Sequence, residues 1–263
     1  MRIRIYNARI LTMKEGEDIF LGEVHTENEK ITYIGAEKSS DGVVWDREID
    51  GNKNLIMPGF KNAHTHSPMT FLRSFADDLP LQPWLQEVVF PAEAKLTTED
   101  TYWLSMLAIM EYLTSGVTAI FDMYFIREGL AEAAVKSGFR TVFCGALNDF
   151  CESIEQMEAD YRKYNENHPL LSYRLGFHAE YTTGKENLIK IAELADKYKA
   201  PVYTHLSETR NEVESCIERN GKSPVAYLDE LGIFQYGGGG FHMVHLDEKD
   251  MEIAKEKGLY VIT

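Results

Sequence analysis

The amino-acid sequence predicts an α/β protein whose main part is a (β/α)₈ TIM-type barrel, C-terminally incomplete in this chain. From Leu55 onward, short apolar strand patterns alternate with helical patterns, which is typical of parallel strands joined by crossover helices. Seven strand patterns can be counted, and the chain stops at Thr263, soon after the seventh begins. Before Leu55 the patterns are all β, so we expect a small accessory β-sandwich-like unit at the N-terminus.

The N-terminal unit is expected to comprise residues 1–53, and the barrel residues 54–263. No helical period appears before the boundary near Gly51, and turn-type stretches at 15–17 and 39–42 separate the strand patterns. The expected strands are Arg2–Tyr6, Ile10–Met13, Phe20–Thr26, Lys30–Ile34 and Val43–Ile49.

In the barrel, each strand pattern is followed by one or two helical patterns. The helix from Thr98 to Ser115 illustrates the signals, because Thr97 and Asp100 can cap its start and Gly116 ends it. The expected strands are Leu55–Phe60, Val117–Asp122, Thr141–Ala146, Tyr173–His178, Pro201–Leu206, Phe241–Leu246 and Leu259–Thr263.

An open, doubly wound sheet is the alternative to the barrel. That class binds dinucleotides through a glycine-rich turn that follows a strand. The four glycines Gly237–Gly240 lack the GxGxxG arrangement and precede a strand. We interpret them as a flexible approach to the sixth strand, and a phosphate-binding loop as the weaker option.

Composition excludes several classes of partner. Of the 263 residues, 27 are Lys or Arg and 42 are Asp or Glu, which gives a net charge of -15 and predicts no binding to nucleic acid. The three cysteines suggest no disulfide framework, so a reducing, cytoplasmic compartment is expected. No apolar run has membrane-spanning length, so no membrane partner is expected. The sequence is compatible with a homo-oligomer.

Two histidines follow the first barrel strand at a spacing of two residues. On a strand this spacing places both side chains on one face, so His64 and His66 can reach one point in space. Imidazole is the commonest metal-binding side chain, and the pair could form half of a zinc site. Taken alone, the pair favours a metal site only modestly over a histidine-rich loop.

Further histidines fall at the ends of later strands, where the chemistry of (β/α)₈ barrels is located. His178 ends the fourth strand, His205 lies near the end of the fifth, and His242 and His245 lie in the sixth. A separation of three residues inverts the face of a strand, so only one of the last two can point inward. His178 could equally be a buried core histidine.

Glu208 follows His205 by three residues, in the loop at the mouth of the barrel. A carboxylate beside a metal-activated water is what general acid–base catalysis requires. The alternative is an ordinary surface glutamate that begins the next helix.

These motifs, in this order, resemble the amidohydrolase superfamily. The resemblance is carried by Met57-Pro-Gly-Phe-Lys-Asn-Ala-His-Thr-His66, Leu113-Thr-Ser-Gly-Val-Thr118, Phe121-Asp-Met-Tyr-Phe125, Thr204-His-Leu-Ser-Glu-Thr209 and Phe241-His-Met-Val-His-Leu246. Within the superfamily, the chain is most similar to the S-adenosylhomocysteine/5'-methylthioadenosine deaminases and chlorohydrolase-like proteins.

The resemblance implies a role for each matching residue. His64, His66 and His205 would bind one divalent metal ion, zinc or alternatively iron, Glu208 would shuttle a proton, and His242 would orient the attacking water. Glu93 would hold ribose hydroxyls, and His178 would lie near the ring of the substrate.

The implied reaction is hydrolytic deamination of an aminated purine nucleoside or a related heterocycle, a small-molecule substrate. Opening of a cyclic amide and a triazine chlorohydrolase or deaminase activity are the alternatives within the superfamily. A non-catalytic metal-binding or scaffold protein is the alternative outside it.

The chain departs from the family pattern in three places. The metal-binding aspartate that follows the eighth strand has no counterpart, so we expect a further C-terminal segment to supply it and to complete the fold. The segment Phe143–Leu147 lacks an arginine that adenosylhomocysteine deaminases tend to carry. Glu180 stands where a proline is commoner, so the natural substrate stays open.

Overall fold

The computed structural model describes residues 1–39 and 42–263 and divides into two compact units, Met1–Gly59 and Phe60–Thr263. The division falls six residues beyond the expected boundary at 53/54, because residues 54–56 pair with the first strand of the chain. The backbone N–H of Leu11 donates to the carbonyl of Ile56 over 2.9 Å, for example. Among the described residues, no helix is both long and apolar enough to cross a membrane.

The first unit is a five-stranded sheet in which β1 is central. Strand β1 pairs antiparallel with β2 and parallel with β4 and β5, and β3 lies outside β2. The strands are β1 (Arg2–Ile10), β2 (Phe20–Glu27), β3 (Lys30–Gly35), β4 (Arg47–Asp50) and β5 (Leu55–Ile56).

Three sequence predictions for this unit need correction or limitation. The two strands predicted at Arg2–Tyr6 and Ile10–Met13 are one strand, β1, which an irregularity between Ile5 and Ala8 interrupts. The strand predicted at Val43–Ile49 begins only at Arg47, and the side chain of Val44 is 81% exposed. The turn predicted at 39–42 includes residues 40–41, which lie outside the described residues.

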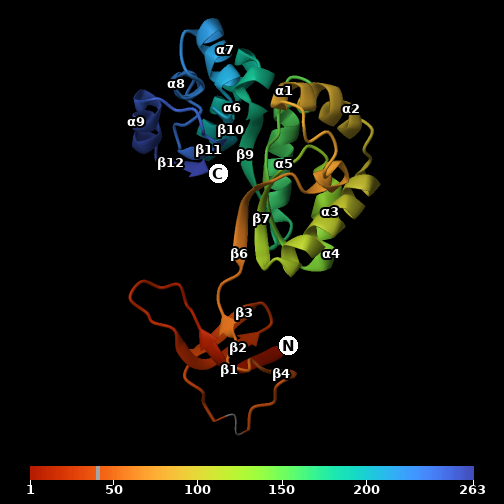
Figure 1. The fold of residues 1–263 in the computed structure, drawn as a ribbon, viewed down its shortest axis with the longest axis vertical. Helices are drawn as coiled ribbons and strands as arrows, with labels where there is room; N and C mark the ends of the chain where they lie inside the picture. Colours follow the sequence, from red (N-terminus) through yellow and green to blue (C-terminus); the bar gives the residue numbers. More distant parts are fainter. Residues whose placement is uncertain (40–41) are drawn as a thin grey trace. The chain divides into compact units, whose positions relative to one another are not determined.

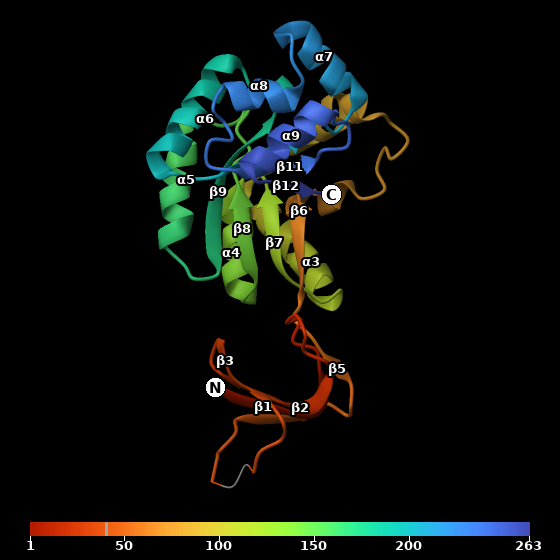
Figure 2. The same ribbon diagram turned by 90° about the vertical axis from the view of Figure 1, so that its left-hand side faces the viewer.

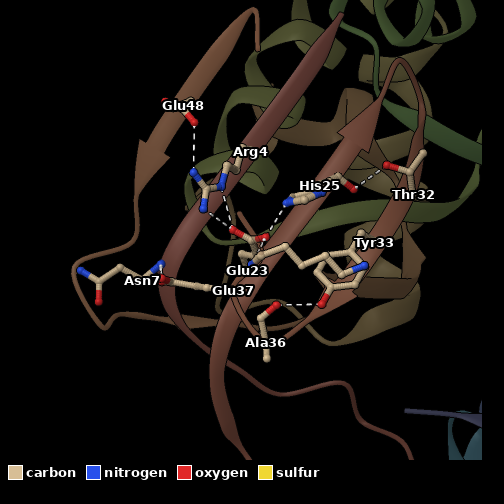
Figure 3. A network of polar contacts seen from close by, with 10 residues as sticks. Arg4, Asn7, Glu23, His25, Thr32, Tyr33, Ala36, Glu37 and Glu48 are labelled. Carbon is tan, nitrogen blue, oxygen red and sulfur yellow. Dashed lines mark hydrogen bonds and ion pairs between the residues drawn. The ribbon is translucent and has the colours of Figure 1, made fainter. Parts of the chain in front are cut away.

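A buried polar cluster joins β1 and β2 in this unit (Figure 3). The carboxylate of Glu23 is fully buried and contacts the guanidinium of Arg4 at 2.7 Å and Nε2 of His25 at 2.8 Å. The backbone N–H of Lys38 donates to the same carboxylate over 3.0 Å. We name Arg4, Glu23, His25 and the Lys38 N–H the Glu23 cluster.

The second unit contains seven parallel strands in sequence order, as the prediction of a β/α barrel requires. The crossover helices lie outside the sheet, and Figure 2 shows α5, α6, α8 and α9 there. The strands are β6 (Phe60–Thr65), β7 (Val117–Met123), β8 (Arg140–Cys144), β9 (Leu171–Ala179), β10 (Val202–Leu206), β11 (Gly238–His242) and β12 (Leu259–Ile262).

The helices of this unit begin and end close to the sequence signals. Thr97 and Asp100 form a reciprocal capping box at the start of α3, and Gly138 ends α4 with a left-handed φ of 71°. The longer helices are α3 (Thr98–Thr114), α4 (Arg127–Ser137), α5 (Ile154–Glu166), α6 (Lys185–Tyr198), α7 (Arg210–Asn220), α8 (Pro224–Glu230) and α9 (Glu248–Lys257).

Short helical segments follow β6 and β9 at the carboxyl ends of the strands. Those after β6 lie at this end of the barrel in Figure 1. They are the 3₁₀ turns η1 (Ser67–Leu72) and η3 (Glu180–Thr182), and the contiguous α1 (Leu81–Pro83), η2 (Trp84–Val89, a π-helix) and α2 (Phe90–Glu93).

The sheet curls, so strands that are not neighbours meet through their side chains. Phe121 of β7 lies against Tyr203 of β10 and Phe241 of β11, with ring centroids 4.9 and 5.6 Å apart. These aromatic side chains pack inside the curl, whereas the larger apolar core lies between the sheet and helices α5, α6 and α8. The predicted barrel architecture is therefore confirmed over these seven strands.

Two predicted strands of the barrel are misplaced. The apolar run Leu55–Phe60 is not one buried strand, because Met57-Pro-Gly59 separates β5 from β6 and the side chain of Phe60 is 58% exposed. The sixth strand is Gly238–His242 and not Phe241–Leu246, so three of the four glycines lie within it. A Cβ atom on Gly238 would lie 1.9 Å from the carbonyl oxygen of Val202. These glycines therefore permit close strand pairing, and their interpretation as a flexible approach is wrong.

Candidate active site

Five histidines meet at the carboxyl ends of β6, β9, β10 and β11. The ring of His64 lies 4.9 Å from that of His66 and 5.0 Å from those of His205 and His242, centroid to centroid. The ring of His178 lies 5.0 Å from that of His205. The structure thus brings together every histidine that the sequence singled out except His245, the second histidine of the pair at the sixth strand.

Backbone carbonyls orient two of these imidazoles. Nδ1 of His66 donates to the carbonyl oxygen of Met123, and Nδ1 of His205 to that of His178, each over 2.7 Å. Because a carbonyl can only accept, Nδ1 carries the proton and Nε2 keeps its lone pair. This is the second-shell arrangement that prepares a histidine to bind a metal ion.

The imidazoles are held in their neutral form. Burial, with smaller contributions from the neighbouring His66 and His242, lowers the pKa of His64 to about 3. Burial likewise lowers the pKa of His66, His242 and, most strongly, His205, and it lowers that of His178 to about 4. Only the neutral imidazole can donate a lone pair to a metal ion.

The donor atoms fit a divalent metal ion. One ligand atom from each of His64, His205 and His242 lies within 4.8 Å of the others. Nδ1 of His64 is buried, and no hydrogen-bond partner reaches it among the described residues. The resemblance implies that His66 binds the metal and His242 orients the water, whereas this trio includes His242. The ring of His66 lies beside the trio, 4.9 Å from that of His64.

Glu208 follows β10 and faces this cluster. Its Oε1 lies 3.6 Å from Nε2 of His242, and burial raises its pKa. The loop that carries it is fixed by Glu212, whose carboxylate accepts the backbone N–H groups of Ser207 and Glu208 over 2.7 and 2.9 Å. Ser207 has a left-handed φ of 51°, a strained backbone of the kind often found at functional sites.

Glu93 ends α2 and is buried, with 8% of its surface exposed. Burial raises its pKa to about 7, although the nearby hydroxyl of Tyr124 opposes the shift. Tyr124 follows β7 and lines the same cavity. His178 is held by Thr182, whose hydroxyl lies 3.0 Å from Nδ1.

Three functional residues were missed by sequence reasoning. Glu212 fixes the loop of Glu208, Tyr124 lies near Glu93, and Asp122 of β7 fixes the segment after His66. Oδ2 of the fully buried Asp122 accepts the backbone N–H of Ser67 over 2.8 Å. A buried carboxylate at the end of a strand is a usable signal, because burial must be compensated by a specific partner. For Glu212 and Tyr124 the sequence offers no comparable signal.

These groups surround one cavity of about 820 Å³ in the second unit. His64, His66, His178, His205, His242, Glu93 and Glu208 all line it. The volume lies in the range of small-molecule sites, which are typically about 300–1,000 Å³. Every residue that the sequence assigned to catalysis, metal or substrate therefore borders the same space.

The chain is similar to several nucleoside deaminases. It is 37% identical to a 5-methylthioadenosine/S-adenosylhomocysteine deaminase of Thermoanaerobacter pseudethanolicus, over 97% of this chain and 61% of that protein. It is 39% identical to a 5'-deoxyadenosine deaminase of Methanopyrus kandleri, over 82% of this chain and 52% of that protein. The chain therefore spans roughly three fifths or less of these relatives.

A solved structure supports the same relationship. An adenosine deaminase from Xanthomonas campestris, with bound zinc, has a TM-score of 0.86 and 30% identity over 99% of this chain and 61% of that one. The sequence model of the amidohydrolase family matches residues 55–262. Because this match covers most of the chain and includes the whole histidine cluster, the chain belongs to the amidohydrolase family.

Proposed function

We propose that this chain carries the active site of a metal-dependent hydrolase that acts on C–N bonds, by hydrolytic deamination of an aminated purine nucleoside or a related heterocycle. The observation that carries the proposal is the set of neutral imidazoles that meet beside Glu208 in one cavity. The two relatives compared by sequence above are nucleoside deaminases, and their names support the choice of reaction.

His64, His66 and His205 would hold one divalent ion, most consistently zinc, with His242 beside them. Zinc prefers nitrogen ligands, and the oriented Nε2 atoms of His66 and His205 suit it. Such an ion, when bound, lowers the pKa of a water molecule from near 16 to about 7 and so provides a nucleophile at neutral pH.

Glu208 moves the proton in this proposal. Burial raises its pKa, so the carboxyl group can take a proton from the attacking water and deliver it to the ring nitrogen. His242, 3.6 Å from Glu208, orients the same water. Protonation of the ring nitrogen makes the amino-bearing carbon electrophilic, and the water oxygen forms a bond to that carbon. The second proton of the water passes to the amino group, and the C–N bond then breaks to release ammonia and leave a carbonyl group on the ring.

Glu93 and His178 would bind the substrate. A carboxylate can accept two vicinal hydroxyl groups at once, and the buried Glu93 suits the ribose of a nucleoside. His178, whose ring borders the cavity, would lie near the heterocycle. An aminated purine nucleoside would thus contact one group at the sugar and another at the base.

The Glu208→Gln variant of the zinc-loaded protein tests the proposal. Turnover of aminated purine nucleosides, measured as ammonia release, should fall by about 10²–10⁴-fold while the zinc content stays unchanged. Glu214→Gln, an exposed position on the neighbouring helix α7, is the matched control and should keep full turnover. Unchanged turnover in Glu208→Gln would remove Glu208 from the mechanism. Failure of the wild-type protein to release ammonia from any aminated nucleoside or base would overturn the function.

A further inference from the structure

Glu180 is a buried acidic residue that has no part in the mechanism proposed above. It is the first residue of the turn η3, directly after β9, and only 6% of its surface is exposed. It stands where a proline is commoner in the family. A carboxylate that leaves water needs specific partners, so the contacts of Glu180 indicate what it does.

The partners of Glu180 lie in the last turn of α7. The guanidinium of Arg219 donates to Oε2 of Glu180 over 2.6 Å, and the side-chain amide of Asn220 donates to Oε1 over 3.0 Å. Both oxygens of the carboxylate are therefore bound. The two partners are the last residues of the helix before its C-cap Gly221. Glu180 thus attaches the turn η3 to the carboxyl end of α7.

The other end of α7 holds the loop of the proposed proton shuttle. Glu212, in the first turn of the helix, is 3% exposed and accepts the backbone N–H groups of Ser207 and Glu208. Buried carboxylates therefore connect one helix to two segments that line the cavity, Glu212 at its start and Glu180 at its end. Because an α-helix is hydrogen-bonded along its whole length, it keeps these two attachment points at a fixed spacing.

The turn that Glu180 anchors carries side chains on the substrate side of the cavity. The hydroxyl of Thr182 donates to the carbonyl of Ala179 over 3.1 Å, so its oxygen accepts from Nδ1 of His178 over 3.0 Å. Nε2 of His178 therefore keeps its lone pair and can accept a hydrogen bond from a ligand. Tyr181, in the middle of the turn, lines the cavity, and its ring centroid lies 6.2 Å from that of His178.

The backbone on the other side of the turn is held independently of Glu180. The backbone N–H of Asp149 donates to the carbonyl of Thr182 over 3.0 Å, and the N–H of His178 donates to that of Leu147 over 2.8 Å. Loss of the Glu180 carboxylate would therefore loosen the side of the turn that faces α7. Strand β9 and the histidines of the other strands would keep their positions.

We propose that Glu180 is a positioning residue, which holds the turn of His178 and Tyr181 in the orientation that binds the nucleoside. This inference rests on the proposed nucleoside deamination. It assigns substrate affinity to Glu180 at one end of α7, whereas Glu212 at the other end serves proton transfer through Glu208. The two contributions are separable, because lost substrate binding raises KM and lost transition-state stabilisation lowers kcat.

The variant Glu180→Ala tests the proposal in the zinc-loaded protein as its gene encodes it, with adenosine as substrate. KM should rise by about 10-fold, which corresponds to the loss of one hydrogen bond to the substrate, while kcat and zinc content stay unchanged. An unchanged KM, or a loss confined to kcat or to zinc content, would overturn the positioning role. Absence of ammonia release from any aminated nucleoside or base by the wild-type protein would instead overturn the proposed function.

Replacement of the partner gives a second, independent test. Arg219→Ala should also raise KM, and KM of the double variant Glu180→Ala/Arg219→Ala should be no higher than that of Glu180→Ala, because the two side chains form one contact. The side chain of Arg219 is 47% exposed, so this variant provides the test even where Glu180→Ala does not fold.

The matched control for Arg219→Ala lies on the same helix. Arg210→Ala replaces an exposed arginine in the first turn of α7 and should leave KM unchanged. If the increases in KM from Glu180→Ala and Arg219→Ala multiply in the double variant, the two residues act separately and the proposed contact is wrong. Equal KM values for Arg210→Ala and Arg219→Ala would likewise contradict it.

Discussion

The Glu23 cluster and the histidine cluster (His64, His66, His178, His205 and His242) are both polar and largely buried. They differ in whether their polar atoms have partners within the chain. Around Glu23 each group has a partner of opposite character. Burial acts to raise the pKa of Glu23, but the Lys38 N–H and the guanidinium of Arg4 outweigh it, and the pKa falls below its usual value. The charged form is the stable one, so this cluster is satisfied by the chain itself.

The histidine cluster is the opposite case. Its imidazoles face one another, burial lowers every pKa, and Nδ1 of His64 has no partner among the described residues. Backbone carbonyls accept from Nδ1 of His66 and His205, so Nε2 of each neutral ring keeps its lone pair. A satisfied buried cluster stabilises a fold, whereas one whose lone pairs converge without donors indicates a ligand. The presence or absence of partners for the buried polar groups therefore distinguishes the structural Glu23 cluster from the candidate functional histidine cluster.

The largest expected effect is a loss of stability when the Glu23 cluster is disrupted. In Glu23→Gln the guanidinium of Arg4 loses its buried counter-charge and Nε2 of His25 loses its carboxylate partner, so the free energy of unfolding of the first unit should fall by about 3 kcal/mol. Chemical denaturation followed by Trp45 fluorescence measures this, in a Trp84→Phe/Trp103→Phe background. Zinc content should not change.

The matched control for this variant lies on the same strand. Glu27→Gln removes the carboxylate of an exposed pair with Arg2, which solvent already screens, so stability should hardly change. If the two variants lose the same stability, burial and partners do not distinguish these two ion pairs. If Glu23→Gln is as stable as wild type, the cluster is not a stabilising one.

The next largest expected effect concerns Asp122, which fixes the segment after His66. In Asp122→Ala the backbone N–H of Ser67 loses its acceptor, so the segment that carries His66 should become less well oriented, and zinc affinity should fall by about 10–100-fold. Competition with a chelator measures the affinity. Asp122→Asn keeps an oxygen that can accept from Ser67 and should restore most of the affinity. Equal losses in both variants would show that charge, and not this hydrogen bond, is what Asp122 contributes.

The sequence predicts the repeating β/α pattern and the positions of the functional histidines because both follow local rules. Strand ends meet at one edge of a parallel sheet, so histidines there can be assigned to a site without knowing any distance. The strand boundaries failed where the local signal was misleading. Pro58 and Gly59 break an apolar run that reads as continuous, and Gly238–Gly240 carry no side chains whose alternation could reveal a strand.

The supporting residues could not be predicted in the same way. Asp122 and Ser67 are 55 residues apart, and Tyr124 reaches Glu93 from a different element. Their partnership depends on the tertiary fold, which no spacing in the sequence encodes. Glu212 lies only four residues from Glu208, but an acidic residue in the first turn of a helix has an ordinary explanation as a favourable end charge.

The smallest expected effect is a pH dependence of ligand binding through Glu93. This carboxyl group resembles Glu23 in burial but not in its partners. Tyr124 lies near Glu93, and no cation accompanies this carboxyl group among its described partners, so burial raises its pKa to about 7. Below that pH the group is protonated and accepts hydrogen bonds weakly. As the pH rises through about 7 it becomes a carboxylate, which binds two hydroxyl groups more tightly.

Binding of an unreactive purine riboside should therefore strengthen by about 5- to 10-fold between pH 6 and 8, the difference between neutral and charged hydrogen bonds. Its 2',3'-dideoxy counterpart offers no vicinal hydroxyls and should show no such change, and this comparison removes any pH effect on the metal site. His178, with a pKa of about 4, stays neutral throughout this range. In Glu93→Gln the affinities of the two ligands should change with pH in the same way, because the amide does not titrate. Calorimetry on the zinc-loaded protein measures both affinities. Parallel pH profiles for the two ligands with wild-type protein would mean that Glu93 does not hold the ribose, because only a carboxylate that contacts the hydroxyls can distinguish them by its titration.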